Sequence, residues 1–489
     1  MKKMVLDHKA YEETARQAVA EGQVLLINEE HTLPLQEGTR LAMFGRMQFH
    51  YYKSGTGSGG MVNVSKVTGI LDALKESGQV ILDPQVLSAY EAWVKEHPFD
   101  AGVGWGNEPW CQVEMELPEE LVSEAAARND AALVIIGRTA GEDQDNKNQE
   151  GSYLLTEKEK DMLSKVRKHF ERLILVLNTG NIMDMDLVEE YHPQALLYAW
   201  QGGMVGGYGT ADVLLGKTCP SGRLTDTIAY KITDYPSDAN FGNRDRDLYE
   251  EDIYVGYRYF ETAAKDRVRY PFGFGLSYTD FRIGDVSFSA EEKDAEITFT
   301  VQNIGTVPGK EVVQVYVTAP EGALSKPEKV LAGFAKTREL KPGLKEQMRI
   351  VIPYESFASY DETGASGFAS SYILEKGEYL FHIGRNVRET EVAGSFTLEK
   401  TVCLASLSQA LAPVTPFERM RFIREKDGAV HKVMEAAPLR KKNPAEKRKE
   451  LLPEELPFTG DQGYRLIDVK EGRVSMDAFV AQFNDNDLS

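Results

Sequence analysis

The chain has 489 residues, 42% of them hydrophobic and 10% aromatic, which is enough apolar material for about two or three domains. Its 76 acidic residues outnumber its 56 basic residues and give a formal charge of −20. Nucleic acid and anionic membranes require a basic surface, so we expect neither as a partner and favour an uncharged substrate.

The first 230 residues alternate short apolar strands with helices. This pattern predicts an α/β sandwich whose mostly parallel sheet is covered on both faces. The predicted helices are Tyr11–Glu21, Val67–Glu76, Pro84–Glu96, Pro118–Arg128, Lys158–His169 and Thr210–Leu215. The predicted strands are Val24–Asn28, Leu41–Gly45, Val80–Leu82, Ala131–Ile136, Arg172–Leu177 and Ala195–Trp200.

A glycine-rich loop, YYKSGTGSGGMVNVS, occupies Tyr51–Ser65. Gly55, Gly57 and Gly60 satisfy G-x-G-x-x-G, the fingerprint of dinucleotide binding. That fingerprint requires the glycines to follow a strand immediately, whereas here they stand well beyond the preceding strand. We therefore favour loop packing over nucleotide binding, and a titration with NAD or ATP would distinguish the two.

A long polar loop, GRTAGEDQDNKNQEGSYLL, follows the strand predicted at Ala131–Ile136. Open α/β sheets bind ligands beyond the carboxyl ends of their strands, so this loop is a candidate site with Glu142 as its most suggestive carboxylate. On spacing alone, solvation of a wet loop is the alternative. The next helix is predicted to begin after Thr156, because Thr156 and Glu159 have the spacing of a capping box.

Residues 231–280 are rich in Tyr, Gly and Phe, and we interpret them as an aromatic connector between domains. Asn243, Asp245 and Asp247 loosely resemble a calcium loop, but the glycine and the terminal glutamate of such a loop are misplaced. We discount calcium for that reason.

From residue 281 to residue 400 the apolar pattern has a period of two, which predicts an antiparallel all-β domain. The predicted strands are Ala295–Gln302, Glu311–Thr318, Lys329–Phe334, Gln347–Ile352, Gly377–Gly384 and Ala393–Leu398. Residues 401–489 are mixed and read as a linker. Within them, Arg440–Glu450 is predicted to be a solvated linker, and Ser475 to cap a helix with Met476, Phe479, Val480 and Phe483 on one face.

The three cysteines, Cys111, Cys219 and Cys403, are widely spaced and indicate neither a disulfide framework nor a zinc site. The first residues, MKKMVLDHKAYEE, lack the apolar segment of a secretion signal, and no apolar run reaches membrane-spanning length. We expect a soluble cytoplasmic protein with no metal and no cofactor.

Three segments resemble glycoside hydrolase family 3 of the β-glucosidase type: WQGGMVGGYGTADVLLGKTCPSGRLTDTIAY (Trp200–Tyr230), YEEDIYVGYRYFE (Tyr249–Glu261) and YPFGFGLSYTDF (Tyr270–Phe281). The all-β region resembles the family's fibronectin type III-like module, which is immunoglobulin-like, through VLAGFAK and LEKGEYLFHIG. The resemblance covers roughly Glu21–Leu398. It implies an α/β sandwich that pairs with a (β/α)8 barrel, with the active site between them.

The resemblance implies that Glu142, in AGEDQDN, is the general acid/base and that Asp145 matches the aspartate of the family's G-E-G-Y-D-R segment. Asp143 and Gln144 replace the usual Gly-Tyr, and Asn146 replaces the usual Arg, so Glu150 stays a second candidate. The rim above the sugar would include Ser54, Gly55 and Thr56, and a purely structural loop is the alternative.

The family's nucleophile is an Asp in an S-D-W type motif on the barrel, and this sequence contains no S-D-W. Asp280, in SYTDF, is not a substitute for it. Some family members place the sandwich first, the fibronectin-like module second and the barrel last. The sequence resembles the front of such a protein, and we expect it to end where the barrel would begin, by engineering, gene splitting or truncation.

Two functions are therefore considered. The first is the acid/base-bearing portion of a retaining β-glycosidase, which hydrolyses terminal non-reducing β-linked sugars once a barrel supplies the Asp nucleophile. The second is a non-catalytic scaffold or carbohydrate-binding fragment that is inactive on its own. Both are compatible with a homo-oligomer.

Overall fold

The computed structural model describes residues 6–488 except residues 61, 140, 143, 410, 426 and 442 and the side chain of Lys447. The chain divides into two compact units. The larger one runs to Leu407 and also takes in Phe417–Ala437, and the smaller one consists of Ser408–Pro416 and Pro438–Ser489. Each unit is described by itself below.

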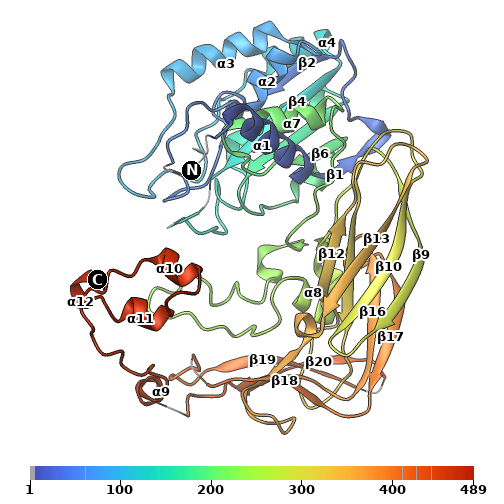
Figure 1. The fold of residues 1–489 in the computed structure, drawn as a ribbon. Helices are drawn as coiled ribbons and strands as arrows, with labels where there is room; N and C mark the ends of the chain where they lie inside the picture. Colours follow the sequence, from blue (N-terminus) through green and yellow to red (C-terminus); the bar gives the residue numbers. More distant parts are fainter. Residues whose placement is uncertain are drawn as a thin grey trace. The chain divides into compact units, whose positions relative to one another are not determined.

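A 6-stranded sheet organises the first part of the larger unit (Figure 1). Its order is β1-β6-β5-β4-β2-β3, in which β1 pairs antiparallel with β6 and the other pairs are parallel. This confirms the predicted mostly parallel sheet. The strands are β1 (Val24–Asn28), β2 (Arg40–Phe44), β3 (Ile81–Leu82), β4 (Ala131–Arg138), β5 (Leu173–Thr179) and β6 (Ala195–Tyr198).

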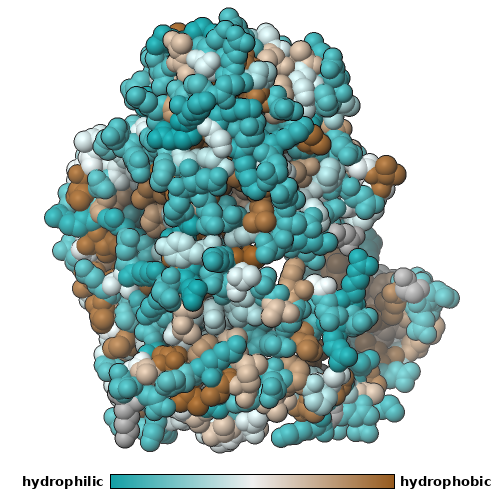
Figure 2. Space-filling model, turned by 180° about the vertical axis from the view of Figure 1, so that it is seen from behind, coloured by the Kyte–Doolittle hydropathy of each residue, from teal (hydrophilic) through white to brown (hydrophobic). Residues whose placement is uncertain are grey.

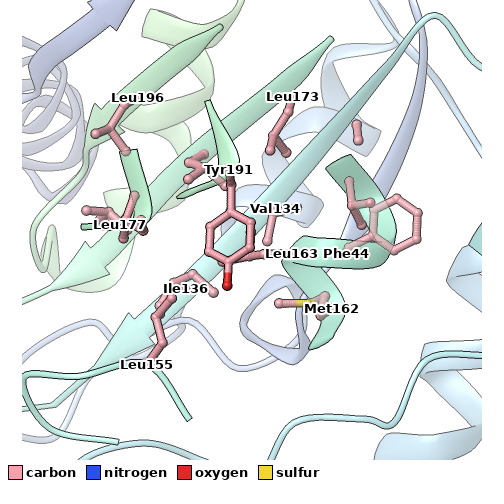
Figure 3. Packing of buried hydrophobic residues seen from close by; sticks show 14 of the residues in the cluster. Phe44, Val134, Ile136, Leu155, Met162, Leu163, Leu173, Leu177, Tyr191 and Leu196 are labelled. Atoms are coloured by element: carbon pink, nitrogen blue, oxygen red, sulfur yellow. The ribbon is translucent and has the colours of Figure 1, made fainter. Parts of the chain in front are cut away.

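Helices cover both faces of this sheet, because successive side chains of its strands enter different cores. Leu133 and Ile135 of β4 pack with α1 (His8–Gly22), α2 (Ile70–Ser77) and α7 (Gly206–Leu214). Val134 and Ile136 pack with α3 (Pro84–Glu96), α4 (Glu119–Arg128), α5 (Glu157–His169) and α6 (Leu187–Tyr191). Figure 3 shows this second core. Burial on both faces explains why β4 is a continuous apolar run.

The predicted helix starts were right where a local signal sets them. At α5 the Thr156 hydroxyl accepts from the Glu159 backbone N–H at 3.3 Å, and the Glu159 carboxylate accepts from the Thr156 backbone N–H at 2.8 Å, which confirms the capping box. By contrast, α7 begins at Gly206 rather than at Thr210. A Cβ on Gly206 would lie 2.0 Å from the Tyr51 hydroxyl oxygen, so close packing places glycines in a helix that their propensity disfavours.

The second part of the larger unit is an antiparallel sandwich, as predicted. One sheet has the order β13-β10-β9 and the other β12-β11-β16-β17, around a core that includes Phe299, Val315 and Phe381. The strands are β9 (Phe281–Ala290), β10 (Asp294–Asn303), β11 (Val312–Thr318), β12 (Val330–Lys336), β13 (Lys345–Pro353), β16 (Gly377–Gly384) and β17 (Thr390–Leu398).

Several shorter elements were not predicted. A small sheet joins β14 (Ser359–Asp361), β15 (Ser371–Leu374) and β18 (Val402–Ser406), and a hairpin joins β19 (Glu418–Arg424) to β20 (Val430–Ala436). The remaining elements are β7 (Ile228–Ala229), β8 (Val268–Tyr270), α8 (Tyr257–Ala263), η1 (Glu29–His31), η2 (Arg46–Gln48), η3 (Gly203–Val205), η4 (Ile232–Asp234), η5 (Lys265–Arg267) and η6 (Tyr354–Phe357). The boundaries proposed at residues 230, 280 and 400 stay predictions.

The aromatic residues of the connector are packing residues. The ring of Tyr254 lies 4.7 Å from that of Phe422 in the hairpin, and the ring of Tyr257 lies 4.5 Å from that of Phe272. Tyr254 and Phe422 form a small core with Met420.

On the face shown in Figure 2, hydrophilic side chains predominate and the hydrophobic ones form separate patches.

The smaller unit contains α9 (Pro444–Glu450), α10 (Leu466–Lys470), α11 (Met476–Val480) and α12 (Asp485–Leu488). The Ser475 hydroxyl accepts from the Ala478 backbone N–H at 3.1 Å, which confirms the predicted cap. The second half of the predicted solvated linker at Arg440–Glu450 forms α9, which begins at a proline, a residue suited to a first helical position. No helix within the described residues has the length and hydrophobicity needed to cross a membrane.

Candidate active site

Three loops meet beyond the carboxyl end of β4. They are the glycine loop (residues 51–60), the Trp105 loop (residues 100–112) and the Glu142 loop (residues 139–155). Thr56 and Gly141 form a bridge between the first and the third. The Thr139 backbone N–H donates to the Trp110 carbonyl at 2.7 Å, which joins the third loop to the second. The sheet edge at which ligands bind in α/β proteins is therefore built from segments far apart in sequence.

Glu142 lies where the Glu142 loop meets the glycine loop, and its side chain is exposed. Its carboxylate accepts a hydrogen bond from the Ser58 backbone N–H at 2.8 Å, and its carbonyl accepts one from the Thr56 hydroxyl at 3.0 Å. The Ser58 backbone N–H, followed by the Ser58 side chain, holds the pKa of Glu142 below its ordinary value. Glu142 is thus ionised at neutral pH, oriented from one side and open to solvent.

The glycines of the glycine loop allow this contact. Gly57 has a φ of +74°, and a Cβ there would lie 2.3 Å from the Cβ of Glu142 and 2.6 Å from its carboxylate. A Cβ on Gly60 would lie 2.0 Å from the Gly55 carbonyl oxygen. Helix α2 begins only at Ile70, so these glycines do not open a helix as the dinucleotide fingerprint requires. Their positions are explained by close loop packing.

The glycine loop carries the predicted sugar-binding residues Ser54, Gly55 and Thr56, of which Thr56 contacts Glu142. Lys53 braces them, because its ammonium donates to the Ser54 hydroxyl at 2.9 Å and to the Gly60 carbonyl at 2.8 Å. Thr56 is only 6% exposed, and its hydroxyl donates to the backbone carbonyl of Glu142, so this threonine helps to hold the glutamate's backbone. Ser54 is half-buried. Sugar contacts by Ser54, Gly55 and Thr56 stay predictions.

Two further carboxylates were singled out in the Glu142 loop. Asp145 is exposed beyond Gln144. Glu150 is exposed too, and its carboxylate lies 4.0 Å from the ammonium of Lys160 on α5, at the other end of the loop from the bridge to Thr56. Asp143, which departs from the family's segment, lies outside the described residues. The geometry therefore ties Glu142, rather than Glu150, to the glycine loop.

The Trp105 loop was missed from sequence. The Gln144 side-chain amide donates to the carbonyls of Gly106 at 2.7 Å and Glu108 at 3.1 Å, which fastens this loop to the Glu142 loop. Burial raises the pKa of Glu108 to about 7, and Trp105 is 48% exposed. The run GVGWGNEPW, dense in glycine and tryptophan between two helices, was the available signal.

Two residues that place the Glu142 loop were also missed. Arg138 ends β4 with only 1% exposure, and its guanidinium pairs with the carboxylate of Glu159 at 2.7 Å. The signal was an arginine at the end of an apolar strand, together with the capping-box glutamate of the next helix.

The region that resembles a calcium loop is a local turn, in which the Asp245 backbone N–H donates to the Asn243 side chain at 2.9 Å. In the described part of the chain, no three His, Cys, Asp or Glu side chains are grouped to hold a metal ion.

Comparison with known proteins gives matches along the chain. The glycosyl hydrolase family 3 C-terminal domain matches residues 23–278, and the fibronectin type III-like domain matches residues 311–387. A β-glucosidase of Ruminococcus albus is 52% identical over 488 residues, which cover 99% of this chain and 50% of that protein.

Solved structures agree with these matches. The crystal structure of a β-glucosidase from Paenibacillus barengoltzii is 44% identical, with a TM-score of 0.93, over 99% of this chain and 54% of that one. β-Glucosidase 3B of Thermotoga neapolitana, solved in complex with glucose, is 33% identical with a TM-score of 0.74, over 81% of this chain and 55% of that one. The chain spans about half the length of these relatives.

Proposed function

Because the chain belongs to glycosyl hydrolase family 3, we propose that it is the acid/base-bearing portion of a retaining β-glucosidase. Its substrates would be β-glucosides or oligosaccharides with a terminal non-reducing β-linked sugar, a class suggested by the names of its relatives. The observation that carries the proposal is the exposed carboxylate of Glu142, held by the Ser58 backbone N–H beyond the carboxyl end of β4. The Asp nucleophile would come from a (β/α)8 barrel.

In the proposed reaction two carboxyl groups about 5–5.5 Å apart act in turn. The barrel's aspartate attacks the anomeric carbon and forms an ester bond while the glycosidic C–O bond breaks. Glu142 gives its proton to the departing oxygen. The Glu142 carboxylate then takes a proton from water, whose oxygen attacks the anomeric carbon, releases the sugar and frees the aspartate.

The first of these steps needs a protonated Glu142, and the chain's own contacts favour the charged form. The Ser58 backbone N–H stabilises the carboxylate and lowers its pKa. A barrel that covered Glu142 would remove water from it and raise its pKa, as burial does for other catalytic acids. On this view the isolated chain presents Glu142 as a base, and the partner completes it as an acid.

We propose that Ser54, Gly55, Thr56 and Asp145 bind the sugar. Support comes from the glycine loop, to which the first three belong and which contacts the Glu142 loop through Thr56. The complex of the Thermotoga neapolitana enzyme with glucose supports a hexose as the ligand. Ser54 is the most direct of the four to test, because Ser54→Ala removes a hydroxyl without changing the backbone.

The test is hydrolysis of aryl β-glucosides by this chain alone and after mixing with a barrel-bearing partner. The chain alone should be inactive, and mixing should restore turnover. Glu142→Gln should then lower turnover of substrates with poor leaving groups by about 10²–10⁴-fold, because those need the proton most. Activated substrates should lose much less. Azide attacks the glycosyl ester without needing a base, so it should restore the turnover of activated substrates, with the glycosyl azide as the product.

Glu150→Gln is the matched control, because it makes the same change in the same loop and should leave both substrate classes unaffected. An unchanged ratio between poor and activated leaving groups in Glu142→Gln would refute the acid/base role. Turnover by the isolated chain would refute the need for a barrel.

A non-catalytic scaffold or carbohydrate-binding fragment is the second candidate. It is favoured by the open sheets of the described residues, none of which is an eight-stranded barrel. Under it, the chain would bind cello-oligosaccharides in calorimetry but stay inactive with every barrel-bearing partner tried.

We also propose a cytoplasmic protein of carbohydrate metabolism. All three cysteines are free, which suits a reducing compartment. Thiol labelling of the protein freshly extracted from its cells should modify every cysteine. Light scattering would establish whether the chain forms a homo-oligomer.

A further inference from the structure

The arginine at the end of β4 is a buried charge that the proposed mechanism does not use. Arg138 is 1% exposed, and a guanidinium has five N–H donors. All five are engaged: Nε donates to Ser152 O at 3.0 Å, Nη1 to Gly137 O at 2.8 Å and Glu159 Oε1 at 2.7 Å, and Nη2 to Leu154 O at 3.1 Å and Glu159 Oε2 at 2.7 Å.

The partner of this arginine belongs to a rigid frame. The Glu159 carboxylate also accepts from the Thr156 backbone N–H at 2.8 Å and from the Thr156 hydroxyl at 3.1 Å. It lies in the first turn of α5, where the helix dipole favours a negative charge. Helix α5 is itself anchored in the core by Met162, Leu163 and Val166, as Figure 3 shows for the first two. The guanidinium is therefore held by an element that packing keeps in place.

The acceptors of Arg138 lie at both ends of the Glu142 loop. Gly137 precedes the loop, whereas the carbonyls of Ser152 and Leu154 belong to the segment that returns to α5. One side chain thus closes the base of the loop. Near Glu142 the loop is held separately, by the bridge between Gly141 and Thr56 and by the Ser58 backbone N–H.

Stability alone is a weak reason for such a pair. Taking two charges out of water costs free energy that their attraction often fails to recover, so apolar residues of similar volume would stabilise a core at least as well. A planar fork that meets three backbone carbonyls and one carboxylate does, however, impose a single geometry on the segments it joins.

We propose that the Arg138–Glu159 pair is a positioning pair that directs the Glu142 carboxylate toward the leaving oxygen by fixing both ends of its loop. The inference rests on the proposed function of Glu142. Neither residue touches the reacting atoms, and each acts through the loop backbone.

The test uses Arg138→Lys in the active mixture of this chain and its barrel. Lysine keeps the charge but cannot reproduce the fork, so the base of the loop should loosen. Because a misplacement of about 1 Å can cost about 10²-fold, turnover of substrates with poor leaving groups should fall by about 10–100-fold. Activated substrates should lose less, because their departing oxygen needs little help from a proton, although the water step still uses Glu142 as its base. Glu159→Gln, which keeps an acceptor, is the second variant should Arg138→Lys fail to fold.

Glu375→Gln is the matched control, because Lys326 and Glu375 form an equally buried pair, 5% and 6% exposed, in the all-β region. Both changes should lower the melting temperature, but only Arg138→Lys should alter the dependence on leaving group. The positioning role is refuted if the two variants share one leaving-group profile. If instead Glu142→Gln leaves the dependence of turnover on the leaving group unchanged, the proposed acid/base function is itself refuted, and the positioning role falls with it.

A second readout needs no turnover. In the isolated chain, carbon-detected NMR can follow the titration of Glu142. Loosening the loop should weaken the bond from the Ser58 backbone N–H, so the pKa of Glu142 should rise toward its ordinary value in Arg138→Lys and stay unchanged in Glu375→Gln. A pKa unchanged in both variants would refute the coupling between Arg138 and Glu142.

Discussion

Glu142 and Asp361 are both loop carboxylates, and their surroundings are opposite. Asp361 ends β14 with 0% exposure. Its Oδ1 accepts from the backbone N–H groups of Thr363, Gly364 and Ala365. Its Oδ2 accepts from the backbone N–H and the hydroxyl of Ser366. The exposed carboxylate of Glu142 accepts from the Ser58 backbone N–H.

The difference separates a carboxylate that builds its loop from one that is available for chemistry. Asp361 has its lone pairs occupied by the turn that follows it, so it has little capacity left for a ligand. Glu142 is oriented by one donor and keeps acceptor sites free for a substrate or a water molecule. In sequence the two segments, GEDQDN and YDETGASG, are both short, polar and acidic.

The largest expected difference in stability is between variants that lack one carboxylate or the other. Asp361→Ala should lower the free energy of unfolding by about 2–4 kcal/mol, because it removes the acceptor of several loop donors at once. Glu142→Ala should change it by less than about 0.5 kcal/mol, as is usual for an exposed side chain. Urea denaturation of both variants measures this, and equal losses would remove the distinction between the loops.

Gly57→Ala tests the side of Glu142 that faces the glycine loop. The variant combines a φ of +74° with a Cβ placed 2.3 Å from that of Glu142, and such backbone strain costs about 1–3 kcal/mol. Glu142 should be displaced, so turnover in the mixture should fall as well. Gly59→Ala is the control, because a Cβ there has no described atom within 4 Å, and it should change neither stability nor turnover.

A smaller effect should appear as a pH dependence of the stability that Asp361 contributes. Burial opposes ionisation of Asp361, but the Ser366 hydroxyl and the backbone N–H donors outweigh it, so its pKa lies below the ordinary value. A carboxyl with a lowered folded-state pKa contributes stability above its unfolded-state pKa of about 3.9 and loses it as pH falls further.

The stability difference between the wild-type chain and Asp361→Asn should therefore be full at pH 7 and shrink below about pH 4. Denaturation curves at several pH values check this. A difference that grew on acidification would contradict the assignment.

The smallest effect is expected from Ser58→Pro, which removes the N–H that holds Glu142. The pKa of Glu142 should rise toward its ordinary value, as measured by NMR titration of the isolated chain. Ser58→Ala keeps the N–H and loses only the hydroxyl, the lesser cause of the lowered pKa, so its rise should be smaller. The reverse order would show that the side chain, and not the backbone, orients Glu142.

Much of the fold was predictable because local patterns carry it. The strand predicted at Ala131–Ile136 lies within β4, since burial on both faces requires a continuous apolar run. The period-two strands and the capping box of Thr156 and Glu159 were predicted for similar reasons. Strand β9 was missed because most of its side chains are not buried, so its residues do not alternate clearly.

The sequence by itself determined the two fold classes, through apolar periodicity, and singled out Glu142, through its place after an apolar strand and its resemblance to a family segment. Only the tertiary structure decided how Glu142 is held. Ser58 lies far from it in the chain, and Arg138 meets Ser152, Leu154 and Glu159 only after the loop has closed. Hydrogen bonds between segments distant in sequence leave no periodic signal, because they depend on which loops the folded sheet brings to one edge.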